Sequence, residues 1–192
     1  MITEHDETYM HLIQWGAVLC TSLVAALWDI RTRRIPNKLT FPFLLAGLVW
    51  STYISGAWGF LEAFAAALLL SIPFLVLYAF AGGGAGDVKL MAGLGAWLGL
   101  STGFTALIFI ILSGGVMGCM FAAYKGQLRP IFARIRELGR AMVATLLFNK
   151  GKGFSGAAEV WVDPKSMVYM PYGFAIFCGV CLSATGTSLW PF

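Results

Sequence analysis

The sequence has few charged residues for its length. Asp, Glu, Lys and Arg make up 11% of the 192 residues, hydrophobic residues make up 59%, and the mean hydropathy is +0.79. A soluble domain carries about 25% charged residues. The chain therefore has too much apolar surface for one water-soluble core, and its composition indicates a protein embedded in a lipid bilayer.

The long apolar stretches predict the fold. Several reach or approach the roughly 20 residues with which a helix crosses a bilayer, and a helix satisfies its own backbone hydrogen bonds in lipid. We predict an all-α, polytopic membrane protein that forms a single integral membrane domain over residues 1–192. About six transmembrane helices are expected, at Leu12–Trp28, Leu39–Ile54, Trp58–Phe80, Val88–Leu100, Thr102–Ala123 and Met167–Leu189.

One long polar connector is expected, at about residues 125–165. Apolar residues such as Ile131, Ile135 and Leu138 recur in it at helical spacing, with Arg134 on the polar side. This pattern predicts an amphipathic segment that lies either on the lipid surface or against the spans. Membrane lipids explain its basic residues, so we do not expect nucleic acid as a partner.

The basic residues also predict the topology. All 13 Lys and Arg fall in three places: the first loop, Lys89, and the connector. Six spans put these places on one side of the membrane, and cytoplasmic loops carry the excess of Lys and Arg. The chain is therefore expected in the cell (inner) membrane as a multi-pass protein, with both termini outside and the basic segments in the cytoplasm.

The stretch GGGAGDVKL, residues 82–90, lacks the features of a phosphate-binding loop. A P-loop requires Gly-Lys-Ser/Thr, whereas Lys89 follows Asp-Val, and Asp87 would repel an anion. The glycines alone fit a plain connector, and Asp87 could cap a helix. However, an ionisable residue at a span boundary is costly and is a functional-site hypothesis by default.

A second aspartate, Asp29, ends the first predicted span. The topology places Asp29 and Asp87 on the same membrane face and at similar depth. Two carboxylates that meet in a partly dry site share one proton, as an aspartic protease requires. One then takes a proton from the attacking water, and the other donates a hydrogen bond to the peptide carbonyl. We predict these two residues as the catalytic pair.

The neighbouring residues have expected roles in binding substrate or shaping loops. Gly84 and Gly86 would let a substrate backbone approach Asp87. Pro36 forces the first loop out of helix, and Asn37 can cap the next span. Lys89 is either a contact near the site or an ordinary cytoplasmic lysine.

Three motifs carry a family resemblance. Gly84-Ala85-Gly86-Asp87 matches the G-x-G-D motif of aspartic membrane proteases, and the wider GGGAGDVKLMAGLGAWLG resembles the type IV prepilin peptidase family. The Asp29 context, DIRTRRIPNKLT, is similar to the first aspartate motif of that family. The segment MPYGF resembles its Pro-aromatic-Gly segment, so Pro171 and Gly173 are also expected to bind substrate or shape a loop at the site.

The resemblance implies an aspartic endopeptidase that removes the leader peptide from prepilin or pseudopilin substrates at the cytoplasmic face, without a metal or cofactor. The sequence most resembles the short peptidases of tight-adherence (Flp) pilus systems. Larger members carry paired C-x-x-C zinc motifs and N-methylate the new terminus. Here the single pair Cys178 and Cys181 lies in an apolar span and is expected to fill packing space, so N-methylation is not expected.

A non-catalytic alternative remains at this point. The two aspartates could relay protons or bind a cation in a membrane transporter or a pilus-assembly scaffold. A small transporter more often places its charges near mid-span and shows an internal repeat, and the sequence shows neither feature.

Overall fold

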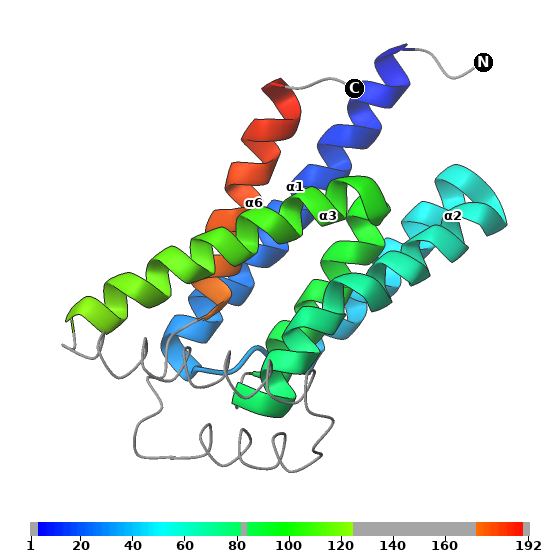
Figure 1. Ribbon diagram of the computed structural model, residues 1–192. Coiled ribbons are helices and arrows are strands. Elements are labelled where there is room, and N and C mark those ends of the chain that lie inside the picture. The colour runs from blue at the N-terminus through cyan, green and yellow to red at the C-terminus, as the bar shows by residue number, and fades with distance from the viewer. Residues whose placement is uncertain (1–3, 82–83, 125–171, 190–192) are drawn as a thin grey trace, which may run out of the picture.

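The computed structural model describes residues 4–81, 84–124 and 172–189. These residues form four helices and no strand (Figure 1), namely α1 (Glu4–Thr32), α2 (Asn37–Ala81), α3 (Ala85–Tyr124) and α6 (Tyr172–Leu189). The all-α prediction is confirmed. The predicted connector, Pro171 and the first residues of the last predicted span lie outside the described residues.

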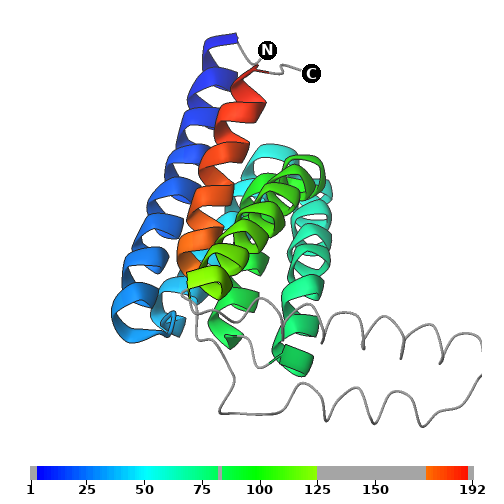
Figure 2. The ribbon, with the colours of Figure 1, turned by 60° about the vertical axis from the view of Figure 1, so that its left-hand side comes forward.

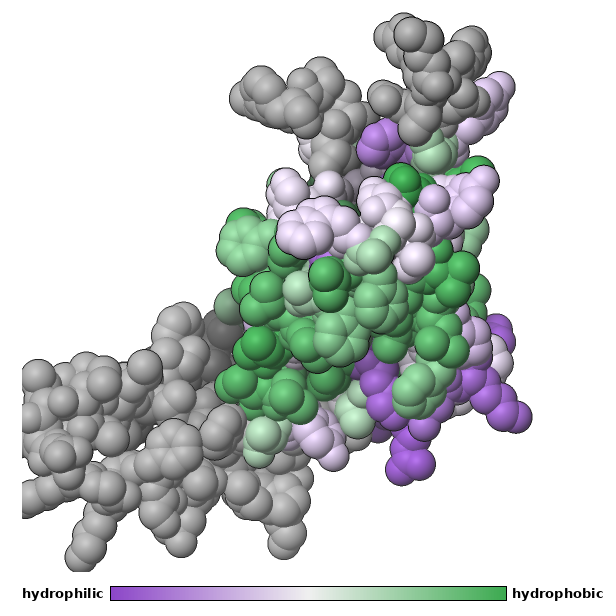
Figure 3. Space-filling view, turned by 90° about the vertical axis from the view of Figure 1, so that its right-hand side faces the viewer, coloured by the Kyte–Doolittle hydropathy of each residue, from purple (hydrophilic) through white to green (hydrophobic). Residues whose placement is uncertain are grey.

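Three of these helices are long and apolar enough to cross a membrane. The qualifying segments are Thr8–Thr32, Asn37–Ala79 and Ala85–Phe121, and the apolar part of α6, Tyr172–Gly186, is shorter. Large apolar side chains cover much of their outer surface, and Figure 3 shows a hydrophobic band with more hydrophilic residues above and below it. Such a surface fits a membrane protein, while the number of six spans stays a prediction.

Two glycines divide the longest helices. The backbone has φ 62° and ψ −146° at Gly56 in α2, and φ 71° and ψ −171° at Gly99 in α3. A side chain makes this region of conformation costly, so it is essentially restricted to glycine. Gly56 lies between the second and third predicted spans, and Gly99 lies at the end of the fourth. Each long helix is therefore two helical segments joined at a bend.

Side chains of α1 and α2 form hydrogen bonds with backbone groups of α3 that lack a helical partner at the bend. The Gln14 side-chain amide donates to the Trp97 carbonyl oxygen, and the Ser51 hydroxyl donates to the Ala96 carbonyl oxygen over 2.9 Å. The Leu100 N–H donates to the Glu62 carboxylate over 3.5 Å. Since lipid offers no hydrogen bonds to a broken helix, these polar residues make the bend tolerable.

The helices form two layers. α2 packs on the first segment of α3, whereas α1 packs mainly on α6 and has few contacts with α2 (Figures 1 and 2). The second segment of α3 continues from the bend onto α6, where Gly179 lies against Ile110. α3 is therefore the helix that joins the layers.

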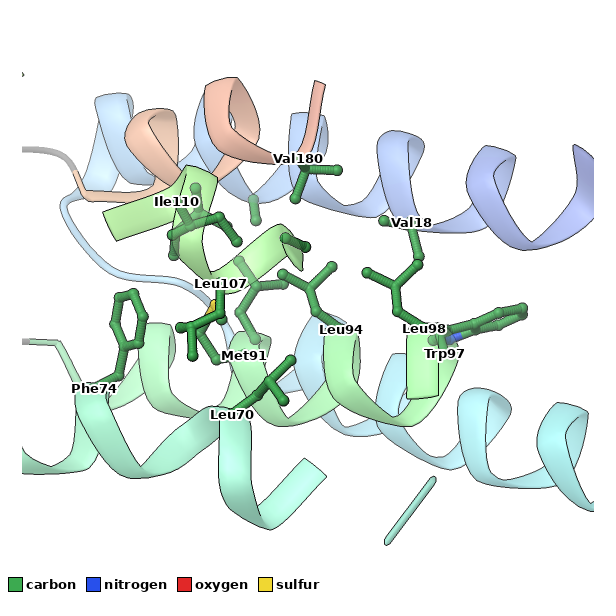
Figure 4. Close-up of a cluster of buried hydrophobic side chains, with 14 of the residues drawn as sticks. Val18, Leu70, Phe74, Met91, Leu94, Trp97, Leu98, Leu107, Ile110 and Val180 are labelled. Carbon is green, nitrogen blue, oxygen red and sulfur yellow. The ribbon is translucent and has the colours of Figure 1, made fainter. Parts of the chain in front are cut away.

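The hydrophobic core lies where the layers meet. Figure 4 shows Val18 of α1, Leu70 of α2, Leu94 and Ile110 of α3, and Val180 of α6 in one cluster. All five side chains are at most 2% exposed. This cluster, to which all four helices contribute, joins both layers in one unit.

Aromatic stacking fixes the first segment of α2 on the first segment of α3. The Trp97 ring stacks between Phe43 and Trp50, with ring centroids 5.8 Å apart in each pair. Its indole N–H donates to the Phe43 carbonyl oxygen over 2.9 Å. This packing determines where α3 begins relative to α2, and hence where Asp87 lies.

Candidate active site

Asp29 lies near the end of α1 and is 7% exposed. The backbone N–H of Gly173 donates to its Oδ2 over 2.8 Å. Gly173 is the second residue of α6, so its N–H has no partner inside that helix, and the helix dipole favours negative charge at this end. The N-terminus of α6 therefore forms the immediate surroundings of the Asp29 carboxylate.

The close approach of α6 to Asp29 explains why residue 173 is glycine. A Cβ atom added to Gly173 would lie 2.9 Å from the Asp29 Cβ and 3.1 Å from its Oδ2. A larger residue would push α6 away and lengthen the hydrogen bond. The sequence predicted Gly173 as a site residue, and the structure places it in direct contact with Asp29.

Asp87 lies in the first turn of α3 and is half-buried. Its backbone N–H donates to the Gly84 carbonyl oxygen over 3.1 Å. A Cβ atom on Gly84 would lie 2.8 Å from the Asp87 Oδ2. Gly84 therefore leaves room for the carboxyl group itself; its predicted role toward a substrate backbone stays a prediction.

The two aspartates come from different helices and lie at the same end of the molecule. Asp29 belongs to α1 and Asp87 to α3, and the loop that follows Asp29 packs through Ile35 on Gly86, next to Asp87. Two helices thus bring the aspartates to one end of the molecule, where the sequence predicted them to lie at the same face.

The loop between α1 and α2 packs on the start of α3. Ile35 is buried, and a Cβ atom on Gly86 would lie 2.8 Å from its Cβ and 3.1 Å from its carbonyl oxygen. The carbonyl oxygen of Pro36 accepts the N–H groups of Leu39 and Thr40, at 3.0 and 3.3 Å, and so begins α2. Gly86 therefore permits contact between the loop that follows Asp29 and the helix that carries Asp87.

Lys89 links the starts of α3 and α2. Its ammonium group donates to the Asn37 Oδ1 over 2.8 Å and lies 5.0 Å from the centre of the Phe41 ring. The Asn37 side chain was expected to cap its own helix, and it accepts the hydrogen bond from Lys89 instead. Both residues shape the surroundings of Asp87 by joining two helices.

Tyr172 lies beside the residue that binds Asp29, and the sequence reasoning did not single it out. It precedes Gly173, its ring packs edge-on against Phe74 with centroids 6.0 Å apart, and a Cβ atom on Gly114 would lie 3.2 Å from its hydroxyl oxygen. The available signal was its place inside the MPYGF segment.

The described helices contain no group of three or more His, Cys, Asp and Glu side chains placed to hold a metal ion. All four cysteines lie in these helices and are free thiols. Cys178 and Cys181 are half-buried along α6.

Comparison with known proteins assigns the family. The model of the type IV leader peptidase family matches residues 16–121, which is more than half of the chain. The chain belongs to the type IV leader peptidase family. The matched region contains Asp29 and Asp87 and ends before Tyr172 and Gly173.

Curated relatives of this chain are identical to it at about a third of the aligned positions. A prepilin leader peptidase/N-methyltransferase of Burkholderia pseudomallei (strain K96243) is 35% identical over 118 residues, which cover 58% of this chain and 38% of the relative. One of Pectobacterium carotovorum subsp. carotovorum is 37% identical over 122 residues, which cover 59% and 43%. Leader peptidase HopD of Escherichia coli is 31% identical over 98 residues, which cover 48% and 61%.

The aligned part of this chain thus spans between 38% and 61% of the length of these relatives. No solved structure matches the chain significantly.

Proposed function

We propose that this member of the type IV leader peptidase family is a membrane-embedded aspartic endopeptidase. The observation that carries the proposal is the placement of Asp29 and Asp87. They come from separate helices, lie at one end of the molecule where the loop after Asp29 packs on the start of α3, and belong to the region that matches the family. The hydrogen bond from Gly173 and the packing of Gly86 on Ile35 support the arrangement.

The proposed reaction uses one ionised and one protonated carboxyl group. The ionised group takes a proton from water while the water oxygen adds to the peptide carbonyl carbon. The protonated group donates its proton to the carbonyl oxygen. The pair then gives a proton to the peptide nitrogen and takes one from a hydroxyl of the tetrahedral intermediate as the C–N bond breaks, which releases a carboxylic acid and an amine and leaves one proton on the pair. The protons belong to the pair as a whole, so neither role is assigned to one aspartate.

The proposed substrate is the leader peptide of a prepilin or pseudopilin. Relatives of this chain are prepilin leader peptidases, which supports the substrate class. The proposed site of cleavage is the cytoplasmic face, because the exposed basic residues Arg31, Arg33, Arg34 and Lys38 follow Asp29 directly and cytoplasmic loops carry such residues.

The proposal includes a multi-pass arrangement in the cell (inner) membrane. One integral membrane domain would cross the lipid about six times, with both termini outside and the connector at about residues 125–165 in the cytoplasm. The reaction needs no metal or cofactor, because the two carboxyl groups supply both proton transfers. N-methylation of the product is not part of the proposal.

Cleavage of a leader by the membrane protein tests the function. Membranes that contain the wild type are incubated with a pilin precursor that carries its leader and first apolar segment. We expect Asp29→Asn and Asp87→Asn each to lower the cleavage rate by about a hundredfold or more, because each removes one proton-transfer group. Product is measured by its shift in electrophoresis and by the mass of the released leader.

Glu62→Gln is the matched control, since Glu62 is an acidic residue that pairs with Leu100 at the bend in α3. Its cleavage rate should stay within twofold of wild type. Unchanged cleavage by both aspartate variants would disprove the carboxylate mechanism and favour the transporter or scaffold alternative.

A further inference from the structure

Two contacts flank Asp87 in the first turn of α3. Gly86, the residue before it, packs on Ile35, because a Cβ atom at Gly86 would lie 2.8 Å from the Ile35 Cβ. Lys89, two residues after Asp87, donates from its ammonium group to the Asn37 Oδ1 over 2.8 Å. The residues on both sides of this proposed catalytic aspartate therefore contact the short segment that follows α1 and begins α2.

The ammonium group of Lys89 binds α2. It lies 5.0 Å from the centre of the Phe41 ring, in addition to its hydrogen bond with Asn37. Successive residues of a helix are rotated by about 100°, so side chains two positions apart do not face each other. An effect of Lys89 on Asp87 is therefore carried by the backbone of α3.

The first turn of α3 depends on contacts from outside the helix. The first four N–H groups of a helix have no partner within it, and helix ends fray. Asp87 lies in this turn, where its N–H bonds to the Gly84 carbonyl oxygen over 3.1 Å. Since a small misplacement of a reacting group lowers the rate strongly, a side chain that holds this turn in place bears on catalysis.

We propose that Lys89 is a positioning residue. Its hydrogen bond to Asn37 holds the first turn of α3 on the start of α2, and thereby keeps the Asp87 carboxyl group in place relative to Asp29. The packing contact at Gly86 fixes one side of that turn, and this hydrogen bond fixes the other. The inference rests on the proposed function of the aspartate pair.

Four variants separate the hydrogen bond from the charge. Lys89→Met removes the donor and keeps an unbranched apolar stem. Asn37→Leu keeps nearly the shape of asparagine and removes the acceptor, whereas Asn37→Asp keeps an acceptor oxygen. Lys38→Met removes the exposed lysine next to Asn37 and is the control for the loss of a positive charge.

The kinetic constants for the leader substrate give the first readout. We expect Lys89→Met and Asn37→Leu each to lower kcat about tenfold, because each removes a hydrogen bond of a charged group that holds a reacting residue, while KM stays within twofold. The double variant should be no slower than either single variant, since both changes remove the same bond. Asn37→Asp and Lys38→Met should keep kcat within about threefold of wild type.

Three kinetic results would overturn the proposal. The first is a wild-type kcat in Lys89→Met. The second is a Lys89→Met variant in which KM alone rises, as expected if the lysine binds the substrate directly. The third is a double variant in which the two losses multiply, because Lys89 and Asn37 would then act independently of each other.

A second readout does not depend on activity. Spin labels are attached at Ile30→Cys and Ala85→Cys, in a background with the four native cysteines replaced by alanine. Both positions are exposed, one residue after the first aspartate and two before the second. We expect a narrow distribution of distances between the labels, which broadens with Lys89→Met and stays narrow with Lys38→Met.

The two readouts distinguish failure of this inference from failure of the proposed function. If the wild type cleaves no leader, the proposed function fails, and the label distances alone decide whether Lys89 holds the start of α3 in place. A distance distribution that is the same in the wild type and in Lys89→Met overturns the positioning role in either case.

Discussion

At the scale of single residues, Asp29 depends on a glycine from another helix. The N–H of Gly173 is one of the first four in α6, which have no partner inside their own helix, and it donates to the Asp29 carboxylate over 2.8 Å. Because residue 173 has no side chain, the two backbones approach closely enough for this bond. The contact places an α6 N–H beside one of the two proposed catalytic groups.

Gly173→Ala tests the dependence on this contact. The new Cβ would lie 2.9 Å from the Asp29 Cβ, so α6 must move and the hydrogen bond to Asp29 must lengthen. We expect leader cleavage to fall by about tenfold or more, since hydrogen bonds to charged groups contribute about 1.5–3 kcal/mol. The rate is measured in membranes that contain equal amounts of protein.

Gly186→Ala on the same helix provides the control. Its new Cβ would meet only Phe109, at 3.7 Å, which is an ordinary contact, so cleavage should equal that of wild type. Equal rates in the Gly173 and Gly186 variants would show that the α6 contact has no part in catalysis.

At the scale of elements, the bend in α3 determines how one helix serves both layers. The first segment carries Asp87 and packs on α2 through Trp97, and the second segment packs on α6, where Gly179 lies against Ile110. The bend needs φ 71° at Gly99, and side chains of Gln14, Ser51 and Glu62 pair the backbone groups around it. The position of Asp87 relative to α6 thus depends on Gly99, which lies at the other end of the first segment of α3.

Gly99→Ala should destabilise the protein, because a side chain is strained in this conformation by about 1–3 kcal/mol. The new Cβ would also lie 3.1 Å from the Glu62 Oε1. Thermal unfolding in detergent, followed by circular dichroism, measures the change as a lower Tm. Gly16→Ala on α1, where no heavy atom lies within 4 Å of the new Cβ, should leave the Tm close to wild type; an equal Tm for both variants would rule out strain at Gly99.

At the scale of the whole molecule, the proposed site lies at the boundary between two layers. α1 and α2 have few contacts with each other, and they are joined near the site by the loop that contains Ile35. The N-terminal end of α1 and the C-terminal end of α6 lie together at the other end of the molecule (Figure 1). This arrangement agrees with a topology in which the site faces the cytoplasm and the termini face outward.

Cysteine labelling in whole cells tests that orientation. In a background with the four native cysteines replaced by alanine, Lys38→Cys and Ser55→Cys introduce single thiols at exposed positions. A membrane-impermeant maleimide should label Ser55→Cys in spheroplasts and label Lys38→Cys only after the membrane is permeabilised. The reverse pattern would invert the proposed topology and place the aspartates on the outer side.

The sequence alone predicted the class of fold and the aspartate pair. Lipid cannot pair backbone groups or solvate charges, so membrane helices appear as long apolar stretches and an aspartate at their ends is conspicuous. The same local signals placed Gly56 between two predicted spans and identified the motif around Asp87. The family resemblance, confirmed by the match to residues 16–121, depended on these short segments.

Only the tertiary structure decided which residues surround the pair. The bond from Gly173 to Asp29 joins residues 144 positions apart, and that between Lys89 and Asn37 joins residues 52 positions apart. Hydropathy and spacing describe neighbours along one helix and carry no information on which helices meet. For this reason the sequence identified two aspartates, whereas the packing of α6 on α1 and α3 revealed that Gly173 contacts the first of them.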